Sequence, residues 1–85
     1  MSWRSIVYGK ESQVRETVQA WAADLERPND QVEIIPRTLF ADGYPEGEPG
    51  AEVVLDMSVP IREITELMTR LEDLTGLRPY CWRHD

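Results

Sequence analysis

The chain has one histidine and one cysteine, and both stand within its last five residues, at His84 and Cys81. A catalytic base or nucleophile needs a formed pocket and a partner that activates it. His84 is the penultimate residue, where chain ends fray, so we expect a solvent-facing imidazole. The only lysine, Lys10, is far from Cys81 in sequence, and we expect an inert thiol that faces the core. We therefore predict a protein that is not an enzyme and binds no cofactor.

A central stretch between Arg37 and Arg62 contains no basic residue. Its five carboxylates are Asp42, Glu46, Glu48, Glu52 and Asp56. Carboxylates are good ligands for Ca²⁺, but their spacing is not that of a twelve-residue EF-hand loop, so no metal site is predicted. We instead expect an acidic ridge that attracts a partner protein with a basic surface. The alternative is that these charges serve only solubility.

Length and charge limit the remaining function classes. The 85 residues suit one domain, taken as residues 1–85, and 16 acidic against nine basic residues give a net charge of −7. This charge argues against direct binding of nucleic acid. No apolar run approaches the roughly 18 residues that a membrane span requires, and no targeting segment is visible. We expect a cytoplasmic protein that contacts neither nucleic acid nor membranes.

Two stretches have the apolar spacing of amphipathic helices. The first spans residues 11–25, with Ser12 as its expected N-cap. The second opens at residues 58–60 and carries an apolar stripe over 61–74. Gly76 is placed to end this helix in a left-handed cap.

Four stretches have strand character, namely residues 3–8, 32–40, 51–57 and 78–84. Pro36 cannot donate a ladder hydrogen bond, which places its strand at a sheet edge. Residues 41–50 are rich in glycine and proline and are expected to form a loop.

The order strand, helix, strand, strand, helix, strand predicts an α+β protein with the ferredoxin-like βαββαβ fold. Right-handed crossovers would place both helices on one face of a four-stranded antiparallel sheet. The first and third strands would then be central and the second and fourth would lie at the edges, which agrees with the position of Pro36.

Aromatic side chains stand on the first and last strands, at Trp3, Tyr8, Tyr80 and Trp82. Alternation leaves two choices. With Val7 and Cys81 toward the helices, the uncovered sheet face carries all of these aromatics except Trp3; with the reverse choice, it carries Trp3. Either way the apolar patch predicts a protein interface, and its simplest partner is a second copy of the chain, giving a homodimer. Stacking of single-stranded RNA is not expected, because residues 52–56 lack the basic and aromatic signature of sheet-based RNA-binding domains.

Residues 61–68, followed by Thr75, Gly76 and Leu77 and then by the last strand, are similar to part of the regulatory domains of the ACT type. This resemblance implies a dimeric domain that binds a small regulatory ligand. The glycine turn that binds the effector in that family has no clear counterpart between the first strand and the first helix, so no ligand-binding residue is carried over.

These observations predict a non-enzymatic module that pairs through an aromatic sheet face and presents an acidic ridge to a basic partner. In its most specific form, it inhibits a nucleic-acid-processing complex, as do small acidic proteins of phages and mobile elements, because carboxylates can occupy the places of phosphates. The alternative is a dimeric domain that binds a small regulatory ligand.

Overall fold

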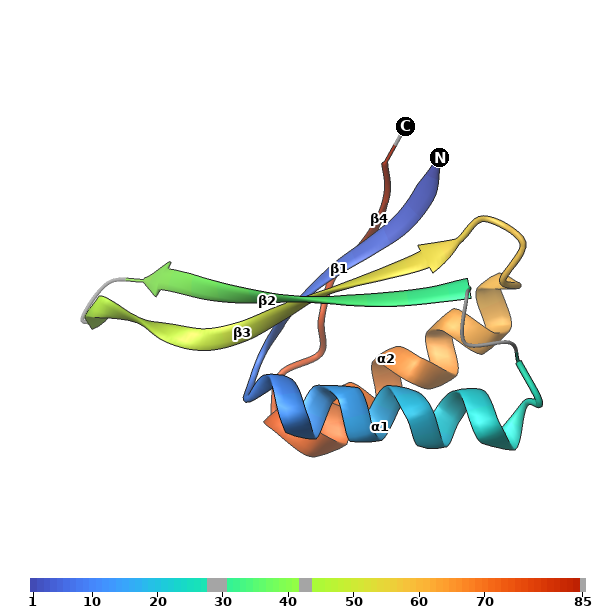
Figure 1. Ribbon diagram of the computed structural model, residues 1–85, viewed down its shortest axis with the longest axis horizontal. Coiled ribbons are helices and arrows are strands. Elements are labelled where there is room, and N and C mark those ends of the chain that lie inside the picture. The colour runs from blue at the N-terminus through green and yellow to red at the C-terminus, as the bar shows by residue number, and fades with distance from the viewer. Residues whose placement is uncertain (28–30, 42–43, 85) are drawn as a thin grey trace.

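Figure 1 shows the computed structural model of the protein, which describes residues 1–27, 31–41 and 44–84. The elements are β1 (Ser2–Tyr8), α1 (Glu11–Asp24), β2 (Val32–Ala41), β3 (Tyr44–Asp56), α2 (Ile61–Thr75) and β4 (Cys81–His84). The strands form one antiparallel sheet in the order β2-β3-β1-β4, and both helices lie on the same side of it. The predicted α+β class, element order and strand order are confirmed.

The two helices and one sheet face build the core. α1 contributes four buried side chains and α2 another four, namely Val14, Val18, Trp21 and Ala22, and Ile64, Leu67, Met68 and Leu71. They pack against inward-facing β1 and β3 residues, among them Val7, Val53 and Leu55. The Trp21 indole is fully buried, and its Nε1 donates to the Glu63 carbonyl at 2.8 Å, which joins the two helices. Neither helix of the described chain is long and apolar enough to cross a membrane.

The predicted loop over residues 41–50 is wrong for most of its length, because β3 begins at Tyr44. β2 and β3 stay paired far along this segment, with Arg37 opposite Gly50 and Leu39 opposite Glu48. The hairpin arm, residues 37–41 and 44–50, extends well beyond the helices (Figure 1). An arm of this kind has no core to cover, so backbone pairing can hold it without the apolar alternation that identifies a half-buried strand. Pro36 lies on the edge strand β2, as predicted.

Of the two helix caps predicted from the sequence, one is wrong and one is confirmed. Ser12 is not the N-cap of α1; Lys10 holds that position, and its side chain makes no capping hydrogen bond. Gly76 does end α2 in a left-handed conformation, with φ of 80°, and its N–H donates to the Glu72 carbonyl at 2.8 Å.

We expect the substitution Gly76→Ala to destabilise the protein by about 1 kcal/mol, because an L-residue is strained at positive φ. A Cβ at this position would meet no atom within 4 Å, so the loss of stability would come from backbone strain and not from a steric clash. The midpoint of thermal unfolding, followed by circular dichroism, should fall by roughly 4–8 °C. Ser12→Ala is the control and should leave the midpoint nearly unchanged; an equal loss in both variants would contradict this account.

Candidate functional site

The sheet face opposite the helices is not covered by any described segment of the chain (Figure 1). Strand register places side chains from all four strands on this surface, since paired residues share a face. We call it the open face, and its members include Arg4, Ile6, Tyr8, Glu33, Ile35, Arg37, Glu52, Val54, Tyr80 and Trp82. The surface is therefore apolar and aromatic around a small group of charges.

The charged group consists of Arg4 on β1, Glu52 on β3 and Arg37 on β2. Arg4 Nη1 donates to Glu52 Oε2, while Arg37 donates to Glu52 Oε1 from Nε at 3.2 Å and from Nη2 at 2.9 Å. Only 9% of the Glu52 side chain is exposed, although it lies on the open face. Each carboxylate oxygen thus has a guanidinium partner, and the cluster ties three neighbouring strands together.

These contacts keep Glu52 ionised. Burial alone would raise the pKa of its carboxyl, but hydrogen bonds from Arg37 and Arg4 and the positive charge of both guanidinium groups outweigh it. The pKa of Glu52 therefore lies below its usual value. The cluster carries a net charge of about +1 when all three groups are ionised, on a chain whose net charge is −7.

Aromatic side chains occupy the β4 side of the open face. The rings of Tyr80 and Trp82 are stacked, with centroids 6.4 Å apart and planes at 13°. Tyr80 is 78% exposed and Tyr8 is 42% exposed. Together with Ile6 they border a hollow of about 440 Å³. Three of the four aromatics predicted for a sheet face are thus brought together.

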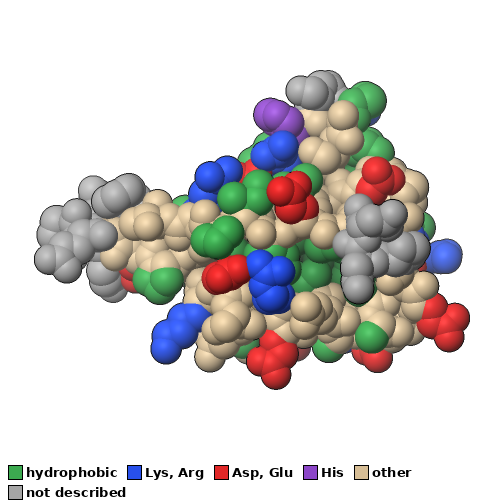
Figure 2. Space-filling view, viewed as in Figure 1, with side chains coloured by type: hydrophobic (Ala, Val, Ile, Leu, Met, Phe, Trp, Pro, Cys, Tyr) green, Lys and Arg blue, Asp and Glu red, His purple; other side chains and the backbone are tan. Residues whose placement is uncertain are grey.

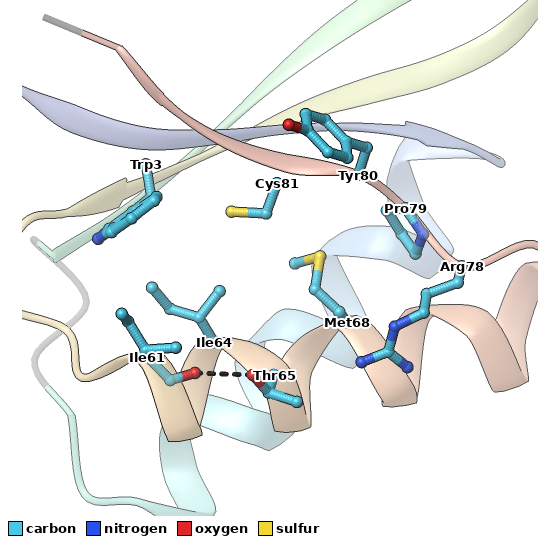
Figure 3. Close-up of a pocket in the computed structure, with 9 residues that line it drawn as sticks. All are labelled: Trp3, Ile61, Ile64, Thr65, Met68, Arg78, Pro79, Tyr80 and Cys81. Atoms are coloured by element: carbon cyan, nitrogen blue, oxygen red, sulfur yellow. Dashed lines mark hydrogen bonds between the residues drawn. The ribbon is translucent and has the colours of Figure 1, made fainter.

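Trp3 lies on the other side of the sheet, so its prediction as a residue of the uncovered face is wrong. Val7 is 1% exposed and Ser5 is fully buried, and Trp3 shares their side of β1 by alternation. Trp3 is half-buried against the core, near Ile64 of α2 (Figure 3). Of the two orientations allowed by the sequence, the one with Val7 and Cys81 toward the helices is present.

The residues of the predicted acidic ridge have different surroundings. Glu52 is a counterion of two arginines, and Asp56 accepts a hydrogen bond from the Ser58 backbone N–H at 2.9 Å. Bonds from the Ser58 hydroxyl and N–H also lower the pKa of Asp56. Glu48 is half-buried on the hairpin arm, whereas Asp42 and the side chain of Glu46 lie outside the described residues. On the face seen in Figure 2, acidic side chains lie scattered, some of them beside basic ones.

Cys81 and His84 do not form a pair. Cys81 is half-buried on the helix side of β4, where burial raises the pKa of its thiol, and His84 is exposed near the end of the strand. Among the residues that the structure describes, no group of three or more His, Cys, Asp or Glu side chains is placed to hold a metal ion.

Sequence reasoning missed the cluster of Arg4, Glu52 and Arg37. A signal was present, because the expected strand order places residues of β1 and β2 on either side of β3, and opposite charges on one face of adjacent strands tend to pair. The register that brings these three side chains together required the length of the hairpin, which the sequence did not indicate.

No protein-family model matches the chain, and searches of curated proteins and of solved structures found no significant match. A function for this chain is therefore inferred from its own residues. The open face has the features of a binding surface: exposed aromatic rings, neighbouring aliphatic side chains and a buried carboxylate that already has two arginine partners.

We expect Glu52→Gln to lower the free energy of unfolding by about 1–3 kcal/mol near neutral pH, because two arginines lose their counterion. The lowered pKa makes the ionised carboxyl stabilising above the unfolded-state pKa, and this stabilisation is lost as pH falls through the folded-state pKa. The difference between wild type and variant, measured by urea unfolding, should therefore shrink below about pH 4.

Glu33→Gln is the matched control, since Glu33 is exposed on β2 and has no ion-pair partner in the described part of the chain. It should change stability little. Equal stability of wild type and Glu52→Gln at neutral pH would show that the cluster does not support the sheet.

Proposed function

We propose that this chain is a protein-binding module without catalytic activity and that it binds through the open face. The observation that carries the proposal is the stack of the exposed Tyr80 on the half-buried Trp82, beside Tyr8 and Ile6, on a sheet face that no described segment covers. Exposed apolar patches of this kind mark interaction sites, and aromatic residues are enriched in interfaces. The order of elements and strands supports a ferredoxin-like fold as the scaffold.

The charges on the open face are compatible with burial by a partner. Leaving one ion of a pair buried without its counterion is costly, but Glu52 already has both arginines as partners. A partner that covers this cluster would not leave the Glu52 carboxylate without a counterion. A partner surface that is largely apolar and carries little charge of its own at the centre would therefore fit.

A second copy of the chain is the partner we propose for this face. The aromatic and aliphatic side chains of the two copies would pack against one another, and the carboxylate of each charge cluster already has its arginine partners. Each copy carries a net charge of −7, so the copies repel one another at long range. Added salt should screen this repulsion and strengthen the dimer, whereas it would weaken a complex with a basic partner.

The double substitution Tyr80→Ser and Trp82→Ser should convert the dimer to a monomer, as measured by light scattering across a range of protein concentrations. Ile61→Ser is the matched control, because Ile61 is 67% exposed but lies on α2, away from the open face. It should leave the mass unchanged. A wild-type protein that is monomeric at every concentration, or a double variant that still dimerises, would refute pairing through this face.

A separate proposal concerns the hairpin arm. The arm extends beyond the helices and its sequence carries Asp42, Glu46 and Glu48 without a basic residue after Arg37, which suits it to contact a basic partner. In its most specific form, the partner is a nucleic-acid-processing complex that the protein inhibits in the cytoplasm. Glu52 is not included, because both of its carboxylate oxygens have arginine partners.

The arm proposal predicts that reversing charge at Glu46 and Glu48, to lysine, abolishes binding of basic partners that wild type retains from lysate at low salt. The same partners should leave wild type as salt rises, because exposed charges are screened. Reversal at Glu16 and Glu66, two exposed positions on the helices, is the control of equal charge and should leave capture intact. Equal capture by wild type and the Glu46 and Glu48 variant would exclude the arm as a binding site.

A further inference from the structure

A groove of about 410 Å³ lies on the helix side of the sheet, between α2 and β4. Figure 3 shows its walls: Trp3 and Cys81 project from the strands, and Ile61, Ile64 and Met68 face them from α2. Its size is that of pockets that take small ligands, which typically measure about 300–1,000 Å³. Trp3 and Cys81 lie on the opposite side of the sheet from Trp82, whereas Arg78, Pro79 and Tyr80 border both the groove and the hollow on the open face.

The groove exists because the helices do not fill the space beside β4. α1 packs on β2 and β3, and α2 packs on β1. β4 has only four residues and is joined to α2 by a short segment that carries Arg78 and Pro79. Ile61 on the first turn of α2 is consequently 67% exposed at the mouth of the groove, although it belongs to the apolar stripe of its helix.

Arg78 is the only charged side chain among the described residues that line the groove. Its Nη1 donates to Thr69 Oγ1 and to Glu72 Oε1, both at 3.1 Å, so α2 holds the guanidinium in place. Its Nε and Nη2 have no hydrogen-bond partner within the described chain. A guanidinium has five N–H donors and can serve a second carboxylate on its other edge.

The remaining walls favour an apolar body. The Trp3 indole is half-buried and offers a flat surface for an aromatic ring. Met68 and Ile64 are buried in the core and supply a fixed apolar floor. Burial raises the pKa of the Cys81 thiol, so the group is neutral and adds no charge to the groove.

We propose that this groove binds a small carboxylate with an aromatic or branched aliphatic body. The apolar body lies between Trp3 and the α2 side chains, and the carboxylate accepts hydrogen bonds from Arg78 at the mouth. Arg78, the one cation at the edge of the apolar groove, supplies the charge that is complementary to the carboxylate. The inference is independent of the proposed protein-binding function, and neither depends on the other.

The probe for the test is 4-phenylbutyrate, with the neutral 4-phenylbutyramide as its matched compound. Cys81 is the only cysteine of the chain and lines the groove, so its alkylation by N-ethylmaleimide reports directly on occupancy. We expect phenylbutyrate to slow alkylation at saturating concentration, and to do so at about tenfold lower concentration than the amide, since a charged bidentate pair is stronger than a neutral bond. No protection, or equal protection by both compounds, would overturn the proposal.

Variants of the charged residues test the role of Arg78. Arg78→Gln should weaken protection by phenylbutyrate about tenfold and leave protection by the amide unchanged. Glu72→Gln should strengthen it, because the negative charge of Glu72 beside the guanidinium repels a second carboxylate. Arg62→Gln is the control, as Arg62 is exposed on α2 but does not line the groove. An Arg78→Gln protein that has the wild-type unfolding midpoint and binds phenylbutyrate like wild type would also overturn the proposal.

Discussion

Glu52 lies in the middle of the sheet, and its two carboxylate oxygens are held by arginines from the strands on either side. This contact adds to the hold on β2, which projects into a hairpin arm and pairs within the described chain with β3 alone. One face of β3 is fixed by the apolar core through Val53 and Leu55, and the other is fixed by the ion cluster. An edge strand interrupted by proline is thus held to the sheet by side chains as well as by its backbone ladder.

The cluster also divides the open face. Charges extend from β2 across β3 to Arg4 on β1, and the aromatic stack occupies the β4 side. On a chain with a net charge of −7, the open face thus carries the two arginines of the cluster together with Glu52 and the exposed Glu33. The net charge and the open face therefore have different effects on binding. The acidity governs long-range attraction or repulsion, and the open face governs short-range complementarity.

The sequence predicted the elements that follow a repeated apolar pattern. The stripe of α2, the left-handed cap at Gly76 and the strand order that places Pro36 at an edge are all present. It failed for the hairpin arm, because residues 44–50 pair through their backbones and have no core to alternate against. The same failure led to Glu52 being interpreted as a free charge, since its partner Arg37 is specified by register and not by local pattern. Trp3 could not be placed until the burial of Val7 fixed the orientation of β1.

β4 is the element that both candidate binding surfaces share. It pairs with β1 over only four residues, and the segment leading into it is anchored by the buried Ser5 hydroxyl, which donates to the Tyr80 carbonyl at 2.9 Å. Tyr80 borders the hollow on the open face, and Cys81, the next residue, lines the groove below. A ligand in the groove and a partner on the open face would therefore both contact this segment of the chain.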